Sequence, residues 1–264
     1  MAVASLGYRT DLMLLGLQGS VIEQHAGYQV VRTPANPTFY WGNFLLLDGP
    51  PAPGTVSSWI STFTREFPGA KHVALGVDGA DGDAGDQAEL ATAGLAVERN
   101  TVLTADMTSP PPHPNKTAQF RVLDSDADWL AALELQEAGH PGGESQGWQG
   151  FGGRRLQARR QMQAKGFGAW FGAFQDGRMV SGLGIFGDGS GIARYQDVDT
   201  HPEHRNQGLA GTLVYQAGQY AQKKLAARTL VIVAEPVGPA IRIYRSVGFR
   251  DTETQVQLHR DPPG

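Results

Sequence analysis

The segment HPEHRNQGLAGTL (residues 201–213) places an arginine, a glycine and an alanine at the spacing R-x-x-G-x-A, directly before an apolar stripe. A glycine-rich turn that leads into a helix leaves backbone N–H groups free, and these groups and the helix dipole both favour an anion. Gly208 lets a phosphate approach the backbone without meeting a Cβ, and Arg205 can add a charge-assisted hydrogen bond. The segment predicts a phosphate-binding loop. The alternative is a tight turn whose small residues serve helix packing.

Other phosphate loops fit this sequence less well. The Walker pattern G-x-x-x-x-G-K-[ST] does not occur in the chain, and residues 205–211 do not supply the G-x-G-x-x-G of dinucleotide-binding folds. A nucleotide-binding protein of either kind is therefore disfavoured.

Acidic side chains flank the loop and are candidates for accepting a proton. Asp197 and Asp199 are spaced by two on a predicted strand, which would put both on one face, and Glu235 ends the next buried strand. A positioned carboxylate can act as a general base. The alternative is solvated carboxylates at strand ends, and His201 and His204 are either further candidates or ordinary surface histidines.

The elements that would position these residues form a mixed α/β pattern with many turns. Two hairpin turns are expected at Asp176-Gly177 and Asp188-Gly189, and the tail at 252–260 reads as a last edge strand. A glycine-rich stretch at 140–153 separates two of the helices. The expected strands lie at 120–123, at three positions over 168–200, at 229–235 and at 252–260; the expected helices lie at 128–139, at 154–165, from the loop to about 225, and at 239–248.

Composition excludes several classes of protein. The absence of cysteine rules out disulfides and thiolate nucleophiles, and no metal site is expected. A net charge of −4 gives no general attraction to nucleic acid or to anionic membranes. No stretch reaches the roughly 18 apolar residues of a membrane helix, and Arg9 and Asp11 precede only a short apolar core. A cytoplasmic protein is expected.

The clearest break in the chain is SPPPHPNKT, residues 109–117, where four prolines fall in six positions. Such a stretch neither continues a helix nor sits inside a sheet, so it reads as a stiff linker. It divides the chain into residues 1–108 and 118–264.

The order of motifs in the second part resembles the GNAT superfamily of acyl-CoA-dependent N-acyltransferases. THPEHRNQGLAGTL matches the signature V-x-P-x-x-R-G-x-G-x-G/A, and Ala240, Tyr244, Gly248 and Phe249 match the family's last helix and turn. The likeness covers about residues 118–258. It implies a central, mostly antiparallel sheet with two splayed strands, flanked by helices.

The resemblance also implies a reaction and its residues. Acetyl-CoA would be the cosubstrate, with its diphosphate on the backbone of residues 206–211 and its pantetheine arm beside Val198–Thr200. An amine would attack the thioester directly, a backbone N–H near Val198 would stabilise the oxyanion, Tyr244 would protonate the thiolate, and Asp199, Asp197 or Glu235 would act as base. The implied coenzyme-binding residues are Val198, Thr200, Arg205, Asn206, Gln207, Gly208, Leu209, Ala210 and Gly211.

Two positions depart from the family pattern, and the acceptor stays undefined. Thr200 stands where the family usually has valine, and Val237 stands where an asparagine is common. The acceptor would be a primary amine of a small molecule or peptide, bound by a monomer or homodimer. The alternative is a non-catalytic acyl-CoA sensor or partner-binding module. A basic run offers either a site for an acidic acceptor or a solvated helix face; it comprises Arg154, Arg155, Arg159 and Arg160.

The first part of the chain resembles a degenerate copy of the second. An offset of 154 positions places Gly208 on Gly54 and Gly248 on Gly94. The same offset places Pro51, Pro53 and Leu90 opposite Arg205, Gln207 and Tyr244, so the copy lacks N–H donors and a proton donor. Residues 1–108 are therefore expected to bind no coenzyme. The aromatic residues Phe39, Tyr40 and Trp41 would line the acceptor cleft or form a core strand.

Overall fold

The computed structural model describes residues 3–139 and 149–261. They form two compact units, one of Met1–Val102 with Thr252–Gly264 and one of Leu103–Asp251. The proline-rich segment 109–117 lies inside the second unit, and the end of the chain belongs to the first. The glycine-rich stretch expected at 140–153 falls mostly outside the described residues.

The first unit is a mixed α/β structure. Its strands follow the order β1-β2-β3-β4-β11-β5, where β5 and β11 also continue into the second unit. Strands β3 and β4 pair in parallel, whereas β1 with β2, β2 with β3 and β4 with β11 pair antiparallel. Its elements are α1 (Leu6–Leu17), β1 (Val21–His25), β2 (Tyr28–Arg32), η1 (Tyr40–Gly42), β3 (Phe44–Leu47), α2 (Val56–Glu66), β4 (Val73–Val77), α3 (Gln87–Thr92), β5 (Ala96–Ala105) and β11 (Arg250–Arg260).

Strand β11 is an interior strand, so the expectation of an edge strand at 252–260 is wrong. Val256 to Arg260 pair with Val77 to Val73 on one side, and β5 is the neighbour on the other. Val256 and Leu258 alternate with polar residues and are buried in the core of the first unit. The alternating pattern marks one buried face, but it carries no information on how many strands flank the segment.

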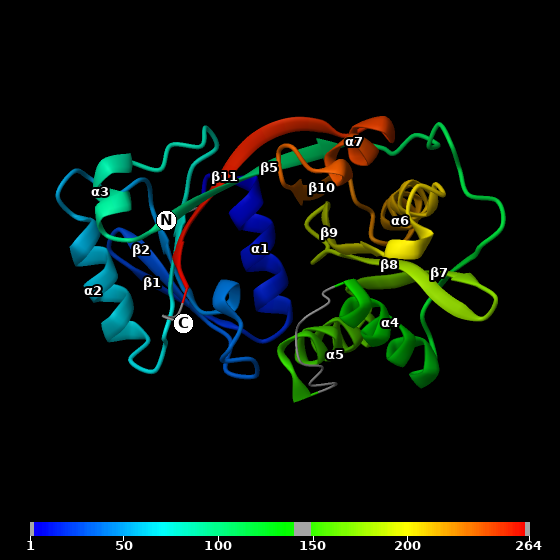
Figure 1. The fold of residues 1–264 in the computed structure, drawn as a ribbon, viewed down its shortest axis with the longest axis horizontal. Coiled ribbons are helices and arrows are strands. Elements are labelled where there is room, and N and C mark those ends of the chain that lie inside the picture. Colours follow the sequence, from blue (N-terminus) through cyan, green and yellow to red (C-terminus); the bar gives the residue numbers. More distant parts are fainter. Residues whose placement is uncertain (1–2, 140–148, 262–264) are drawn as a thin grey trace. The chain divides into compact units, whose positions relative to one another are not determined.

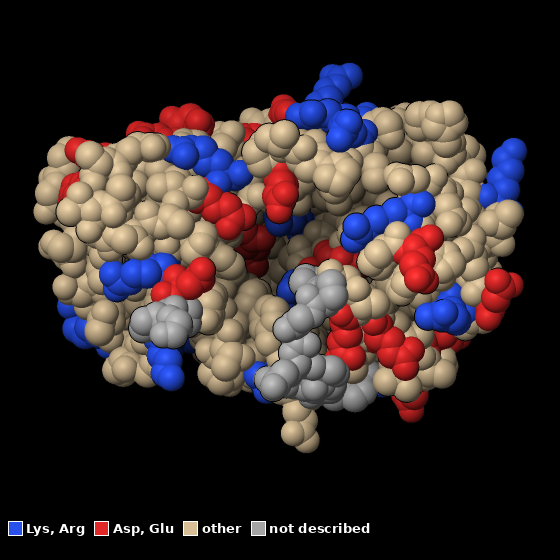
Figure 2. Space-filling view, viewed as in Figure 1, with Lys and Arg blue, Asp and Glu red and all other residues tan. Residues whose placement is uncertain are grey.

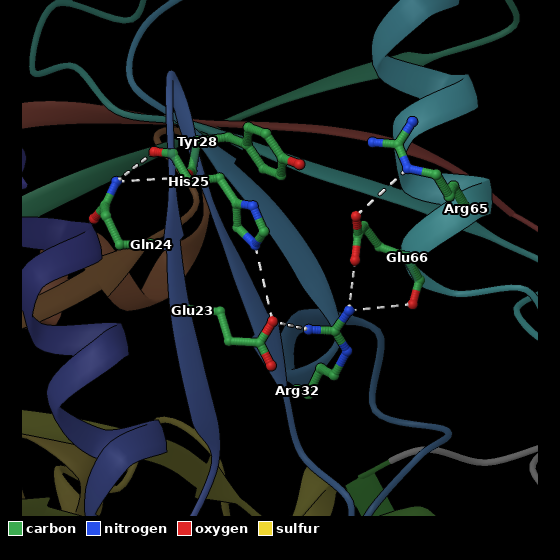
Figure 3. A network of polar contacts seen from close by, with 7 residues as sticks. All are labelled: Glu23, Gln24, His25, Tyr28, Arg32, Arg65 and Glu66. Carbon is green, nitrogen blue, oxygen red and sulfur yellow. Dashed lines mark hydrogen bonds and ion pairs between the residues drawn. The ribbon is translucent and has the colours of Figure 1, made fainter.

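Arg32 ties three elements of the first unit together (Figure 3). Its guanidinium on β2 donates to Glu23 on β1 at 3.0 Å and to Glu66 at the end of α2 at 2.7 Å. Strand β1 and the C-terminal end of α2 are thereby both bonded to the Arg32 side chain.

The aromatic stretch of the first unit packs within that unit. Tyr40 stacks on His72 with ring centroids 3.8 Å apart, and Trp41 meets Phe44 edge to face at 5.7 Å. Phe39 also packs against the core. The expected core strand begins only at Phe44, and the aromatic residues precede it, since Tyr40–Gly42 form a 3-10 turn before strand β3.

The second unit is also mixed α/β, with strand order β10-β9-β8-β7-β6. Figure 1 shows α4 and α5 on one side of these strands and α6 on the other. Asp176 and Gly177 both have positive φ, 49° and 78°, as a two-residue hairpin turn of type I′ requires. Its elements are β6 (Gln119–Val122), α4 (Asp126–Gly139), α5 (Phe151–Ala164), β7 (Gly168–Gln175), β8 (Arg178–Phe186), β9 (Ile192–Thr200), η3 (Pro202–His204), α6 (Leu209–Lys224), β10 (Thr229–Ala234) and α7 (Pro239–Ser246).

The described surface carries both signs of charge. On the face in Figure 2, lysine and arginine side chains are interspersed with aspartate and glutamate. Within residues 3–139 and 149–261, no helix is long and apolar enough to cross a membrane.

Candidate active site

Strands β9 and β10 pair in parallel at one end and separate at the other. Their register runs from Thr229 opposite Ile192 to Val231 opposite Arg194, and no further pair follows although both strands continue. The end of β9 that is not paired with β10, residues 195–200, leads directly into the loop at 201–208. The splayed strands expected from the sequence are present.

A β-bulge in β9 separates the two aspartates that the sequence placed on one face. Gly182 pairs with Asp199, but Gly184 pairs with Gln196, so β9 holds one extra residue between these pairs. Asp197 has φ of 49°, a left-handed conformation that accompanies such bulges. The two carboxylates therefore point into different surroundings, and the shared face does not exist.

Asp197 forms a partly buried ion pair and does not line the cavity described below. Its Oδ1 accepts a hydrogen bond from Arg155 Nη2 at 2.6 Å, and the two side chains are 18% and 22% exposed. Burial alone would raise the pKa of Asp197, but the charges of Arg155, Arg159 and Arg194 outweigh burial and hold that pKa below its usual range. Asp197 is thus ionised and already partnered, which suits a structural role.

The basic run on α5 faces the sheet more than the solvent. Arg159 is 3% exposed and donates to Gln196 on β9 at 2.5 Å, next to the Arg155–Asp197 pair. Arg160 pairs with Asp126 at the start of α4. These contacts hold α5 against the bulged part of β9.

The loop before α6 has the backbone that the motif predicts. Asn206 and Gly208 have positive φ, 61° and 73°, and Gly208 is the N-cap of α6. Within the described part of the chain, the backbone N–H groups of residues 206–211 donate no hydrogen bond. A row of free N–H groups at the start of a 16-residue helix is the arrangement that favours a phosphate.

A cavity of about 750 Å³ collects the predicted coenzyme residues. Its lining includes Tyr244 and Asp199 together with residues of the proline-rich segment, of α4 and of α7. All nine residues implied for coenzyme binding line it: Val198, Thr200, Arg205, Asn206, Gln207, Gly208, Leu209, Ala210 and Gly211.

Tyr244 and Asp199 both line this cavity, and His204 lines it as well. Tyr244 is 5% exposed, and burial, with a smaller effect of the Asp199 charge, raises its pKa well above the usual value. The hydroxyl is therefore protonated at neutral pH and able to donate. The Asp199 backbone carbonyl accepts from Ser181 Oγ at 2.7 Å, which fixes the strand at this point.

Of the other candidates, His204 lines the cavity, whereas Glu235 and His201 do not. Glu235 is exposed after β10 and does not line the cavity. His204 bonds Gln175 at 2.9 Å through Nδ1, and His201 caps the 3-10 turn that leads into the loop. His201, Glu203 and His204 also have ligand atoms within 4.8 Å of one another, near enough to share a metal ion after side-chain adjustment.

The two departures from the family pattern have different surroundings. The hydroxyl of Thr200 lies 2.8 Å from that of Ser181 on β8, a cross-strand contact that valine cannot make. Val237 is 88% exposed. The first substitution is explained by its partner, and the second leaves the entrance to α7 without a side-chain amide.

The sequence missed the contribution of the proline-rich segment. Pro111, Pro112 and His113 line the cavity, and a Cβ at Gly208 would lie 2.1 Å from the His113 carbonyl oxygen. Gly208 is therefore required by this close approach as well as by its positive φ. Proline content signals stiffness, and nothing in the segment's own sequence says where it docks.

The corresponding loop of the first unit is filled by a side chain. Glu89 on α3 accepts from the N–H groups of Gly54 and Val56 at 2.7 and 2.8 Å. Gly54 has φ of 80°, close to the 73° of Gly208, and Leu90 is completely buried. The groups that are free before α6 are thus satisfied internally before α2.

Comparison with known proteins supports the family resemblance. Residues 129–249 match the model of the acetyltransferase (GNAT) family. No match was found among curated proteins.

Solved structures resemble the chain over nearly its whole length. A functionally unknown conserved protein from Staphylococcus epidermidis ATCC 12228 has a TM-score of 0.73 at 12% identity, covering 93% of this chain and 95% of its own. A GCN5-related N-acetyltransferase from Kribbella flavida has a TM-score of 0.67 at 17% identity, covering 99% and 97%. A tandem GNAT protein from the clavulanic acid biosynthesis pathway has a TM-score of 0.52 at 16% identity, covering 100% and 98%. At these identities the likeness is one of fold.

Proposed function

We propose that the protein transfers an acetyl or other short acyl group from acyl-CoA to a primary amine, because residues 129–249 match the model of the acetyltransferase (GNAT) family. The observation that carries this proposal is the single cavity that holds the free N–H groups of residues 206–211, Asp199 and Tyr244. One part of the cavity suits a diphosphate, and the other part holds a proton donor and a proton acceptor.

Each residue has a definite task in this reaction. Acyl-CoA supplies a thioester carbon that the amine nitrogen attacks directly. The N–H groups of residues 206–211 and the charge of Arg205 bind the diphosphate. Val198 lies where the strands separate, and its backbone N–H is the proposed oxyanion donor.

The proton balance closes within the same cavity. Asp199 takes the proton that the amine loses as its nitrogen bonds to the carbonyl carbon. Tyr244 gives a proton to the sulfur as the carbon–sulfur bond breaks. Burial keeps Tyr244 protonated until that moment, because its pKa lies well above its usual value.

We also infer that the chain is a tandem pair in which only the second unit binds coenzyme. Glu89 occupies the loop of the first unit that corresponds to residues 205–211, and Leu90 replaces the tyrosine hydroxyl. The inference agrees with the expectation, drawn from Pro51 and Pro53, that residues 1–108 bind no coenzyme.

The first test is amine-dependent thiol release from acetyl-CoA over a panel of polyamines, amino acids, aminoglycosides and peptides. Arg205→Ala should weaken coenzyme binding several-fold, and Arg178→Ala, a matched change on an exposed hairpin, should not. Saturable coenzyme binding without thiol release would favour the sensor alternative. Absence of any coenzyme binding would refute the phosphate loop.

A further inference from the structure

The segment Thr108–Thr117, here called the strap, is anchored along α6 within the second unit. At its start, Thr108 donates to the Tyr215 carbonyl at 3.1 Å, and the Ser109 N–H donates to the Val247 carbonyl at 2.9 Å. Thr108 packs so closely that a Cβ at Gly218 would lie 2.6 Å from it. The strap is therefore part of the fold and not a free connection.

The other end of the strap is fastened to the phosphate-binding loop by Asn115. Its side-chain Nδ2 donates to the Gln207 carbonyl at 2.9 Å, and its backbone N–H donates to Thr212 Oγ1 at 2.9 Å. Thr212 Oγ1 in turn donates to the Gly208 carbonyl at 2.8 Å. Asn115 thus holds the Gln207 carbonyl directly and the Gly208 carbonyl through Thr212, which fixes the backbone of the loop whose N–H groups are free.

Between these anchors the strap forms a wall of the cavity. Pro111 is buried beside Gly211, where a Cβ would lie 3.3 Å from the proline ring, and Pro112 and His113 complete the wall. Four prolines hold this stretch extended before any ligand arrives, so little conformational entropy is lost on binding. A preformed wall and a pinned loop together fix the positions of the N–H groups.

We propose that Asn115 is a positioning residue for the coenzyme diphosphate, acting through Gln207 and Thr212. The strap would then form one wall of the coenzyme site. This rests on the proposed function in one respect, since the anion is taken to be the diphosphate of an acyl-CoA. Asn115 itself need not touch the ligand. Its effect should be confined to the diphosphate and should not reach the pantetheine arm.

The experiment compares two probes on the full chain by calorimetry: CoA, and pantetheine, which lacks the diphosphate. Asn115→Ala removes the bond to Gln207, and Thr212→Val removes the acceptor of the Asn115 N–H while keeping side-chain shape. Each should weaken CoA binding about five- to tenfold, the scale of one lost hydrogen bond, and leave pantetheine binding unchanged. Thr64→Val is the control, because its hydroxyl donates to the carbonyl four residues earlier in α2, as that of Thr212 does in α6, but it lies in the first unit.

Each outcome decides the proposal. Unchanged CoA affinity in Asn115→Ala, or an equal loss for CoA and pantetheine, overturns it. If Asn115→Ala does not fold, the same two criteria apply to Thr212→Val. Since binding is the readout, an enzyme that releases no thiol with any amine leaves this test intact and counts only against the catalytic proposal.

Discussion

Glu89 Oε2 accepts a hydrogen bond from the Gly54 backbone N–H at 2.7 Å, so the first unit uses its own carboxylate as the anion at the start of α2. Thr55, the N-cap of that helix, makes no side-chain cap bond, which leaves this task to Glu89. At the offset of 154 positions the counterpart of Glu89 is Ile243, which cannot accept a hydrogen bond. The backbone N–H groups at the start of α2 therefore donate to Glu89, whereas the equivalent groups at the start of α6 donate no hydrogen bond within the described residues.

We predict that Glu89→Ala lowers the free energy of unfolding by about 1–2 kcal/mol, as for the loss of a helix cap. Coenzyme affinity and a stoichiometry of one per chain should not change. Urea unfolding and calorimetric titration measure the two quantities, and Glu98→Ala on β5 serves as a matched control. A wild-type stoichiometry of two would contradict the assignment.

Tyr244→Phe should lower kcat by roughly 100-fold while the Kd for CoA changes less than twofold. The ring stays in its buried place, and only the donor to sulfur is lost. Steady-state kinetics with the best amine and calorimetry with CoA separate the two effects. Equal rates for the variant and the wild type would remove the tyrosine from the mechanism.

The two aspartates of β9 should behave differently when neutralised. Asp199→Asn should reduce kcat by roughly 100-fold and flatten the acidic limb of the pH–rate profile. Asp197→Asn should instead lower the free energy of unfolding by about 3 kcal/mol, because it leaves the Arg155 charge without its 2.6 Å partner. If Asp197→Asn flattened the pH profile while Asp199→Asn did not, the roles would have to be exchanged.

Acid should weaken the fold through Asp128. Its carboxylate accepts two hydrogen bonds of 2.6 Å from Arg121, and these bonds, against the opposing effect of burial, hold the pKa of Asp128 far below its usual range. The stabilisation is therefore complete above the unfolded-state pKa of about 4 and is lost as the pH falls below it.

The expected difference in unfolding free energy between the wild type and Asp128→Asn is about 2 kcal/mol at pH 7, reduced from the value for a fully buried pair because Arg121 is 34% exposed. Unfolding in urea between pH 7 and pH 2 measures it. The difference should shrink through the acidic range; a difference that stayed constant would show that the ion pair is not its source.

Local patterns were sufficient to predict the loop before α6, whereas the splayed strands and the coenzyme-binding residues were implied by the resemblance to the GNAT superfamily. R-x-x-G-x-A and the apolar stripe of α6 are short-range signals, and the positive φ of Gly208 is a conformation that glycine adopts readily. The hairpin at Asp176-Gly177 was predictable for the same reason. The loop and the hairpin each depend on residues within a few positions of one another.

The features that were missed depend on partners distant in sequence. One extra residue in β9 rotates Asp197 toward Arg155, and strand periodicity carries no sign of such a bulge. The docking of the strap depends on Gln207, which is 92 positions from Asn115. The helix at Leu6–Leu17 was also not predicted, because its apolar residues were considered only as a short apolar run near the N-terminus.

The placement of β11 has a consequence for how the chain folds as it is synthesised. The first unit needs Val256–Arg260 beside β4 to complete its sheet, yet these residues emerge from the ribosome after the whole second unit has been made. Residues 1–102 must therefore wait with an open strand edge while the later unit assembles. The usual order, in which N-terminal parts fold first, does not hold for this sheet, because it is complete only when the last strand has been synthesised.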